Sequence, residues 1–290
     1  MSDVAIAYRE PSTLAKFGAF LRSDWRGAFS LAFLALLILV SVAAPLLAPY
    51  PPTQQDLGNA LAPFSAEHWL GTDDLGRDTL SRLIYGASAS LYACFLAVAI
   101  AILIGVPVGL LAGYRGGWVD DVISRVIDAL LSFPAIVLAI AVTGALGIGL
   151  TNGMISVGIV FSPQLARLVR ARALVVRNDL FVDAARCFGA STPRILWKHV
   201  LPNTVQPVIV QVTLLLAGAL LAEASLSFLG LGIQPPYPSW GAMLARAYQN
   251  MEIVPEQMYP PGLAILFTAL AFNTLGESLR TALDPTTKTL

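Results

Sequence analysis

The chain has 290 residues, of which 56% are hydrophobic and 12% are charged, and its mean hydropathy is +0.71. Soluble domains carry about 25% charged residues, so this composition excludes an ordinary soluble domain and indicates an integral membrane protein. The formal net charge is zero, which removes any global electrostatic argument for nucleic-acid binding.

The segment 1–27 precedes the first long apolar window. Lys16, Arg22 and Arg26 lie in it. An apolar helix face flanked by basic residues is typical of an amphipathic helix lying on the cytoplasmic leaflet, in contact with membrane lipid. The apolar residues that share this face are Leu14, Phe17, Leu21 and Trp25.

Windows free of Asp, Glu, Lys and Arg locate the membrane spans, because a helix needs about 20 apolar residues to cross the hydrocarbon core. The window 129–166 is too long for one helix, and GIGLTNG at 147–153 predicts a tight turn between two spans. The prolines of QPPYPSW at 234–240 predict a loop. We therefore predict an all-α, six-helix transmembrane domain over 28–290, with spans at about 28–48, 88–112, 122–146, 150–169, 204–223 and 261–279.

The distribution of Lys and Arg sets the orientation. With a cytoplasmic N-terminus, fifteen of the 18 basic residues fall inside and only Arg77, Arg82 and Arg246 fall outside. The positive-inside rule therefore predicts that both termini are cytoplasmic. The loops 49–87 and 224–260 are then extracytoplasmic, and the loop 170–203 is cytoplasmic.

The extracytoplasmic stretch 73–82 carries charges of alternating sign at i,i+4 spacing, which predicts a short amphipathic helix with Asp73–Arg77 and Asp78–Arg82 attractions. Such a helix either leads into the second span or docks an extracytoplasmic partner. DDLGRD lacks the alternating oxygen ligands of a calcium loop, so no metal site is expected. The candidate docking residues are Asp73, Asp74, Arg77, Asp78 and Arg82.

Two acidic residues lie near span ends, where an ionisable group is a candidate for the transport pathway or a gate. Asp128 follows Arg125 by three residues, so the favoured interpretation is a structural pair. Glu223 ends the fifth span, where it either lines the outer mouth of the pathway or is structural. Small residues such as Gly105, Gly109 and Gly113 favour close helix packing rather than a ligand site.

The cytoplasmic loop predicts two short helices that meet at an elbow. Asn178 or Asp179 is placed to cap a helix over 180–188, and Gly189 is placed to end it in a left-handed conformation. A second helix is expected to start with Pro193 in its first turn and to stop near Val200, before Pro202. Phe181, Ala184, Ala185 and Phe188 are expected to share one face, suited either to a groove in a partner or to a position against anionic headgroups.

DAARCFGASTPRILWKHVLPN at 183–203 resembles the EAA loop of ABC importer permeases. Asp183 stands for the family's Glu, Gly189 has the family's spacing, and His199 stands where the pattern has Ile. The resemblance implies that this loop is the coupling helix that docks to a separate ATPase subunit. The residues it assigns to docking are Asp183, Ala184, Ala185, Gly189, Arg194, His199, Leu201 and Pro202.

Three longer stretches are similar to the C-type permeases of dipeptide, oligopeptide and nickel importers: HWLGTDDLGRDTLSRLIYGASASL at 68–91, SLSFLGLGIQPPYPSWGAML at 225–244 and LAFNTLGESLRTALDP at 270–285. The resemblance implies a type I importer fold in the bacterial inner membrane. It also implies a second homologous permease, one or two P-loop ATPases that bind ATP and Mg²⁺, and an extracytoplasmic solute-binding protein. Di- and oligopeptides are the expected substrates, with nickel chelates and glutathione as alternatives.

Two other classes of function are disfavoured by the residues themselves. The chain has no Gly-Lys-Ser/Thr sequence, so it holds no P-loop and no cofactor of its own is expected. An ion-coupled secondary transporter usually carries acids or histidines near the midplane, and the predicted span centres are nearly bare of them. An intramembrane enzyme is disfavoured because His68 and His199 fall on opposite sides of the membrane and H-E-x-x-H and G-x-S-x-G are absent.

Overall fold

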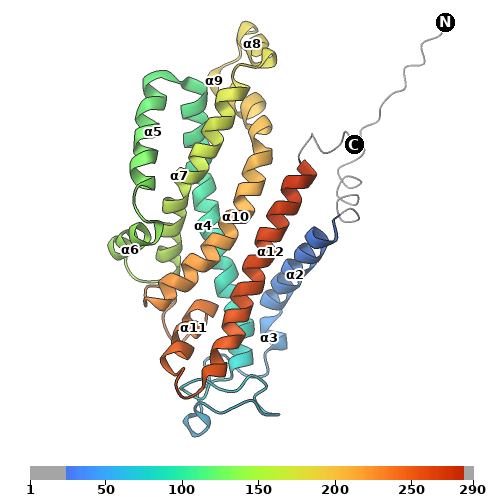
Figure 1. Cartoon of the computed structure of the whole chain (residues 1–290), viewed down its shortest axis with the longest axis vertical. Helices are drawn as coiled ribbons and strands as arrows, with labels where there is room; N and C mark the ends of the chain where they lie inside the picture. Colours follow the sequence, from blue (N-terminus) through green and yellow to red (C-terminus); the bar gives the residue numbers. More distant parts are fainter. Residues whose placement is uncertain (1–23, 284–290) are drawn as a thin grey trace, which may run out of the picture.

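The computed structural model describes residues 24–283, and the protein is an elongated bundle of helices (Figure 1). Within that range the only extended pairing is an isolated antiparallel bridge between Thr72 and Asp78, so the predicted all-α class is confirmed. Nearly all of the predicted amphipathic segment 1–27 lies outside the described residues. The elements are α2 (Trp25–Val42), α3 (Ala44–Leu47), η1 (Leu57–Asn59), α4 (Thr79–Arg115), α5 (Gly117–Leu131), α6 (Ala135–Leu146), α7 (Leu150–Val176), α8 (Leu180–Cys187), α9 (Thr192–Ile195), η2 (Leu196–Val200), α10 (Leu201–Phe228), α11 (Trp240–Gln249), η3 (Pro255–Met258) and α12 (Tyr259–Leu283).

Four helical stretches of the described chain are long and apolar enough to cross a membrane by themselves. They are α2, α4, the continuous stretch Thr192–Phe228 and the stretch Pro255–Leu283. Each overlaps one of the predicted spans. The count of six crossings stays a prediction, because α7 contains the polar residues Asn152, Gln164 and Arg167 and is not among the four.

The span predicted at 122–146 is not one continuous helix. The segment forms two helices, α5 and α6, whose axes differ by 96°. The break falls at Ser132–Pro134, where the proline ring disfavours a helical conformation of Phe133 and offers no N–H to continue the hydrogen-bond ladder. The pair is therefore either one broken span or a re-entrant element.

The turn predicted at 147–153 is confirmed. The helix α6 ends at Leu146 and α7 begins at Leu150, with Gly147 at φ +98° between them. The Asn152 side-chain amide donates to the carbonyl oxygens of Leu146 and Gly147 at 3.0 and 3.2 Å. It thereby satisfies carbonyl groups that the end of α6 leaves without helical partners.

Close contact between α4 and α7 depends on glycine. A Cβ atom at Gly109 would lie 2.4 Å from the carbonyl oxygen of Ala166, and at Gly105 and Gly113 it would lie 2.7 and 2.6 Å from other carbonyl oxygens of α7. Only residues without a side chain let two helix backbones approach this closely. The packing role predicted for these glycines is confirmed.

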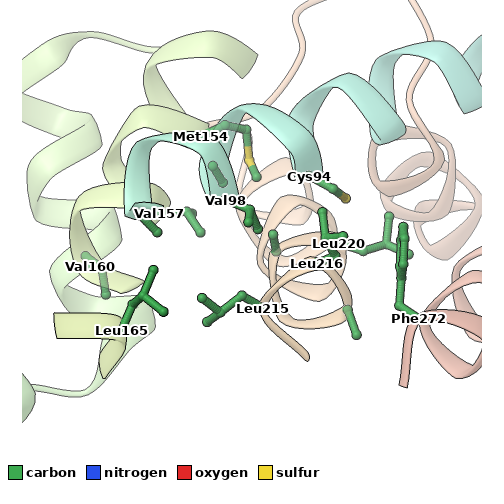
Figure 2. Close-up of a cluster of buried hydrophobic side chains, with 14 of the residues drawn as sticks. Cys94, Val98, Met154, Val157, Val160, Leu165, Leu215, Leu216, Leu220 and Phe272 are labelled. Carbon is green, nitrogen blue, oxygen red and sulfur yellow. The ribbon is translucent and has the colours of Figure 1, made fainter. Parts of the chain in front are cut away.

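Figure 2 shows in close-up the part of the hydrophobic core where α4, α7, α10 and α12 meet. Apolar side chains from α4, α7, α10 and α12 interdigitate there, so the four helices form one packed body. The labelled members of this cluster include Cys94 and Val98 of α4, Met154 and Val157 of α7, Leu216 and Leu220 of α10, and Phe272 of α12.

The two ends of the bundle carry different segments (Figure 1). The elbow around α8 and α9 lies at one end, and the start of α2 and the end of α12 are directed toward that end. The loop that follows α3 and the helix α11 lie at the other end. The predicted topology assigns the end that carries α8 to the cytoplasm, and on that prediction we call the two ends cytoplasmic and extracytoplasmic below.

Candidate functional site

The elbow at the cytoplasmic end begins with α8, Leu180–Cys187, which is one residue shorter than the predicted helix 180–188. Asp179 is the N-cap residue, although its side chain accepts no capping hydrogen bond. Gly189 adopts φ +74° just beyond the C-terminus. The N–H of Gly189 donates to Arg186 O at 2.9 Å and that of Ala190 to Ala185 O at 3.0 Å. This pair of bonds is a Schellman motif, which fixes the direction in which the chain leaves α8.

The second arm of the elbow starts as predicted but does not end as predicted. Pro193 lies in the first turn of α9, but Pro202 does not end the helix. The residues Leu196–Val200 form a π-helical turn in which Leu201 N–H donates to Leu196 O, and α10 follows without a break. The wider turn makes room for the Pro202 ring, and the Asn203 side chain donates to His199 O at 2.7 Å.

The helix α8 has two apolar faces rather than one. Val182 is fully buried, and Ala185 packs against the hydrophobic core. On the other side, Phe188 and Leu180 are 91% and 86% exposed, and Phe181 is also exposed. The predicted common face therefore divides, because Ala185 contacts the chain's own core while Phe181, Ala184 and Phe188 face outward. The docking role of Ala185 stays a prediction, as do those of the other elbow residues.

Arg186 joins α8 to the end of α4. Its guanidinium donates to the Tyr114 hydroxyl at 3.3 Å and lies 5.2 Å from the centre of that ring. The hydrogen bond to Tyr114 is the main cause that raises the pKa of Arg186, and Asp183, at 2.9 Å, adds to it. Sequence analysis did not find the contact with Tyr114, which lies 72 positions earlier in the chain.

The remaining predicted docking residues lie on the second arm. Arg194 and Pro202 are exposed, and His199 and Leu201 are half-buried. The His199 ring is 6.4 Å from that of Phe181. The structure thus brings together residues from both arms of the elbow.

At the extracytoplasmic end, the short helix predicted at 73–82 is wrong. The helix α4 begins only at Thr79. The Asp73 side chain accepts from the N–H groups of Leu75 and Arg77 at 3.0 and 3.1 Å, and Gly76 adopts φ +69°. These local hydrogen bonds form a turn that competes with a helix.

The charged residues of that turn are tied into their own chain. Arg77 is 1% exposed and donates through Nε to Asp73 at 2.7 Å. The Arg82 side chain lies 3.3 Å from Asp73 and donates to Pro52 O at 2.7 Å. The predicted Asp73–Arg77 attraction is confirmed, whereas the predicted partner of Arg82, Asp78, is wrong.

Asp78 instead caps α4. Its carboxylate accepts from Ser81 N–H at 2.7 Å and lies 2.9 Å from Nδ1 of His68. Because Arg77, Asp78 and Arg82 are buried, this subunit does not present them to a partner. Asp73 and Asp74 are partly exposed, and a docking role for these residues stays a prediction.

Asp128 pairs with Arg167 of α7 rather than with Arg125, so the predicted partner is wrong. A neighbouring pair that the sequence did not indicate joins Asp120 of α5 to Arg170 of α7 at 2.7 Å. Both pairs are interhelical, and both acids lie on the α5 surface that packs against α7. The sequence alone indicated only Arg125, three positions before Asp128, as a partner, because it gives no information about which helices pack together.

Glu223 lies inside the subunit, with an exposure of 1%. The hydroxyl groups of Ser227 and Ser239 each donate to its Oε1 at 2.8 Å. Ser90 of α4 is 3.5 Å from the other carboxylate oxygen. Of the two roles left open for Glu223, these contacts favour the structural one.

Comparison with known proteins adds the family. Residues 105–289 match the model of the binding-protein-dependent transport system inner membrane component, and residues 17–63 match the N-terminal transmembrane domain of oligopeptide transport permease C. The solved structures of the MetNI methionine ABC transporter, in inward-facing conformations, give TM-scores of 0.59 and 0.55 at 20% and 18% identity. The matches cover 71% and 70% of this chain and 98% and 96% of theirs, so they support the fold.

Curated relatives are more similar in sequence. The glutathione transport system permease protein GsiD of Shigella flexneri is 49% identical over 257 residues, which cover 88% of this chain and 85% of that protein. The dipeptide transport system permease protein DppC of Alkalihalophilus pseudofirmus is 43% identical over 277 residues, covering 92% and 91%. The family model matches more than half of the chain, and the predicted resemblance is confirmed. The chain is therefore a permease of the family of inner-membrane components of binding-protein-dependent ABC transport systems.

Proposed function

We propose that this chain is one of the two permease subunits of an ATP-driven importer of short peptides. The observation that carries the proposal is the outward apolar face of α8, where Leu180, Phe181 and Phe188 are exposed at the cytoplasmic end. Water-exposed aromatic and aliphatic side chains on a short, rigidly terminated helix favour a protein partner. In this family the expected partner at that place is the ATPase.

In this proposal the chain contributes half of the translocation pathway and the coupling loop, and partner subunits hydrolyse ATP. ATP and Mg²⁺ would bind to the ATPase subunits, because this sequence holds no P-loop. A second homologous permease would complete the pore, and a solute-binding protein would deliver the substrate from outside. Closure of the ATPases on ATP would move α8, and the continuous η2–α10 stretch would carry that motion into the membrane.

The substrate class rests on the relatives. One relative is named for glutathione, a tripeptide, and the other for dipeptides. The substrate class common to both names is a peptide of two or three residues. A solute-binding protein would set much of the selectivity within that class.

Affinity purification of the tagged chain in mild detergent, followed by mass spectrometry, tests the partners. We expect a second permease and one or two P-loop ATPases to be recovered with the wild-type chain. A variant with Leu180→Ser and Phe188→Ser should retain the permease and lose the ATPases. A matched control is Trp118→Ser, which removes another exposed aromatic residue outside α8 and should retain every partner. Recovery of ATPases with the double variant at the wild-type amount would contradict the docking role of α8.

Uptake into cells that lack the chain tests the substrate. Radiolabelled alanyl-alanine and glutathione should each be tried, with and without the chain, and unlabelled nickel–histidine should be added as a competitor. We expect uptake of at least one peptide to depend on both the chain and ATP. Uptake that survives ATP depletion and stops with a protonophore would instead indicate an ion-coupled transporter.

A further inference from the structure

The extracytoplasmic helix α11 is fastened to α10 through Glu223. Ser239, the N-cap residue of α11, donates its hydroxyl to the Glu223 carboxylate and accepts from the N–H of Ala242 at 3.2 Å. One serine hydroxyl thus joins the carboxylate to the first turn of α11. A Cβ atom at Gly241 would lie 2.6 Å from Cα of Ala224, so the two helix backbones are in direct contact.

The same junction includes α4. The backbone N–H of Trp240 donates to Ser90 Oγ at 3.1 Å, and its indole N–H donates to Leu83 O at 2.9 Å. Trp240 is 1% exposed. The N-terminus of α11 therefore lies in a buried polar junction between α10 and α4. Of the residues named here for that junction, Glu223 is the one that carries a charge.

The other end of α11 is held by different contacts. Arg246 donates to the Asp74 carboxylate at 2.9 and 3.1 Å. The Tyr248 ring lies 5.2 Å from that of Phe228 at the end of α10. These contacts are partly exposed, and exposed ion pairs contribute little, so the buried junction at Glu223 is the stronger attachment.

The helix that carries Glu223 also carries the elbow. The stretch Thr192–Phe228 is helical over 37 residues, which corresponds to a length of about 55 Å at 1.5 Å per residue. It starts in the cytoplasmic elbow and ends at the extracytoplasmic junction (Figure 1). One continuous element thus connects the proposed ATPase contact with α11.

We propose that Glu223 is a positioning residue that makes α11 move with α10, so that motion of the cytoplasmic elbow reaches the extracytoplasmic face. This inference rests on the proposed function. A carboxylate suits the role because Oε1 accepts from two hydroxyl groups at once, while Oε2 lies 3.1 Å from where a Cβ atom would stand on Gly241. An apolar residue would leave the hydroxyl groups of Ser227 and Ser239 buried without an acceptor, which is costly.

Transport and ATP hydrolysis by the complete importer in proteoliposomes test the proposal. The variants are Glu223→Gln, which keeps one acceptor oxygen, Glu223→Leu, which keeps none, and Glu252→Leu, which removes an exposed acid at the same end. The substrate is alanyl-alanine or glutathione, whichever the wild-type complex accumulates. We expect Glu223→Leu to keep basal ATP hydrolysis and to hydrolyse about tenfold more ATP per substrate transported, a size typical of residues in a coupled network. Glu223→Gln should restore most of the coupling, and Glu252→Leu should behave as wild type.

A distance measurement tests the attachment itself. Spin labels at Gln206→Cys on α10 and Ile253→Cys beyond α11 occupy exposed positions, in a Cys187→Ser background that leaves only the buried Cys94. In wild type the distance distribution should be narrow and the same with and without ATP. Glu223→Leu should broaden it.

The two measurements separate failure of this proposal from failure of the proposed function. If the wild-type complex shows no substrate-dependent ATP hydrolysis, the proposed function fails, and the label distances in the permease pair still test the attachment. If Glu223→Leu does not assemble, Ser239→Ala, which removes one donor and the cap, takes its place. An unchanged ratio of ATP to substrate together with an unchanged label distribution, in whichever of these variants assembles at the wild-type amount, would overturn the proposal.

Discussion

At the extracytoplasmic end, the charged side chains of Arg77 and Glu223 are each 1% exposed and bonded within the chain, whereas at the cytoplasmic end the apolar side chain of Phe188 is 91% exposed. In water, charged side chains favour exposure and aromatic side chains favour burial, so both arrangements are the reverse of the usual preference. Burying charge requires several internal partners, and exposing an aromatic ring is unfavourable unless another molecule covers it.

The contrast separates two kinds of candidate residue. The polar residues of the extracytoplasmic end join α4, α10 and α11 through buried hydrogen bonds. The exposed apolar residues of α8, Leu180, Phe181 and Phe188, are not covered by their own chain, and they are available to a second protein. Substitution of the buried Arg77 should therefore lower stability, whereas substitution of the exposed Phe188 should impair assembly or uptake.

The largest effect is expected from Arg77→Ala. The change removes the 2.7 Å partner of Asp73, which keeps Arg82 at 3.3 Å, and it opens a cavity where the Arg77 side chain was buried. Large-to-small substitutions at buried positions typically cost about 2–5 kcal/mol of the free energy of unfolding. We expect the purified permease to lose most of its thermal stability in detergent. Arg194→Ala, at an exposed arginine of the other end, is the control and should stay within about 0.5 kcal/mol of wild type. Equal melting temperatures for the two variants would contradict the contrast between the ends.

A smaller loss of stability is expected from a substitution in the middle of the bundle, where α4 packs against α7. Gly109→Ala places a methyl group 2.4 Å from a backbone oxygen, and overpacking of this kind costs about 1–3 kcal/mol. Gly144→Ala has nothing within 4 Å of the new methyl group and serves as the matched control. Thermal unfolding should separate the two variants. If both unfold at the wild-type temperature, the helices do not pack as closely as described.

Local sequence signals predicted the parts of this structure that depend on neighbours in the chain. Apolar windows located α2, α4, α10 and α12, and the glycine at position 189 fixed the end of α8. These features follow from hydropathy and from backbone conformation, which act over a few residues.

The missed partners lie far away in the sequence, whereas the turn at Asp73 and the continuation of the helix through Pro202 arise from local backbone geometry. Asp128 pairs with Arg167, 39 positions away, and Ser90 lies 133 positions from Glu223. Pro202 was expected to stop a helix, but a π-helical turn accommodates it. The correct partner can be chosen only from the packed structure, because a residue near in sequence, such as Arg125 for Asp128, has the right charge to form the pair.

The next effect tests the elbow through its backbone. Gly189 adopts φ +74°, and a Cβ atom there would meet nothing within 4 Å, so any penalty for a side chain comes from backbone conformation alone. Gly189→Val should cost about 1–2 kcal/mol in that conformation and should lower uptake by changing the direction of the chain after α8. Gly189→Asn should retain uptake, since asparagine adopts left-handed conformations more readily. Uptake by the valine variant at the wild-type rate, measured at equal membrane content, would show that the elbow's direction is not needed.

The smallest effect on stability, and the sharpest test of the contrast, is expected from Phe188→Ser. The side chain is 91% exposed, so its removal should change the free energy of unfolding by no more than about 0.5 kcal/mol. If α8 inserts its outward face into an ATPase, however, loss of an aromatic anchor should weaken assembly by about 2 kcal/mol, roughly 30-fold. Titration of the purified ATPase against permease pairs in nanodiscs measures that affinity, and thermal unfolding of the same samples measures stability. Trp118→Ser removes an exposed ring of α5 and should leave both quantities unchanged. A stable Phe188→Ser variant that binds the ATPase as wild type does would mean that the exposed ring is covered by something other than the ATPase, and the proposed contact would then have to move to the second arm of the elbow.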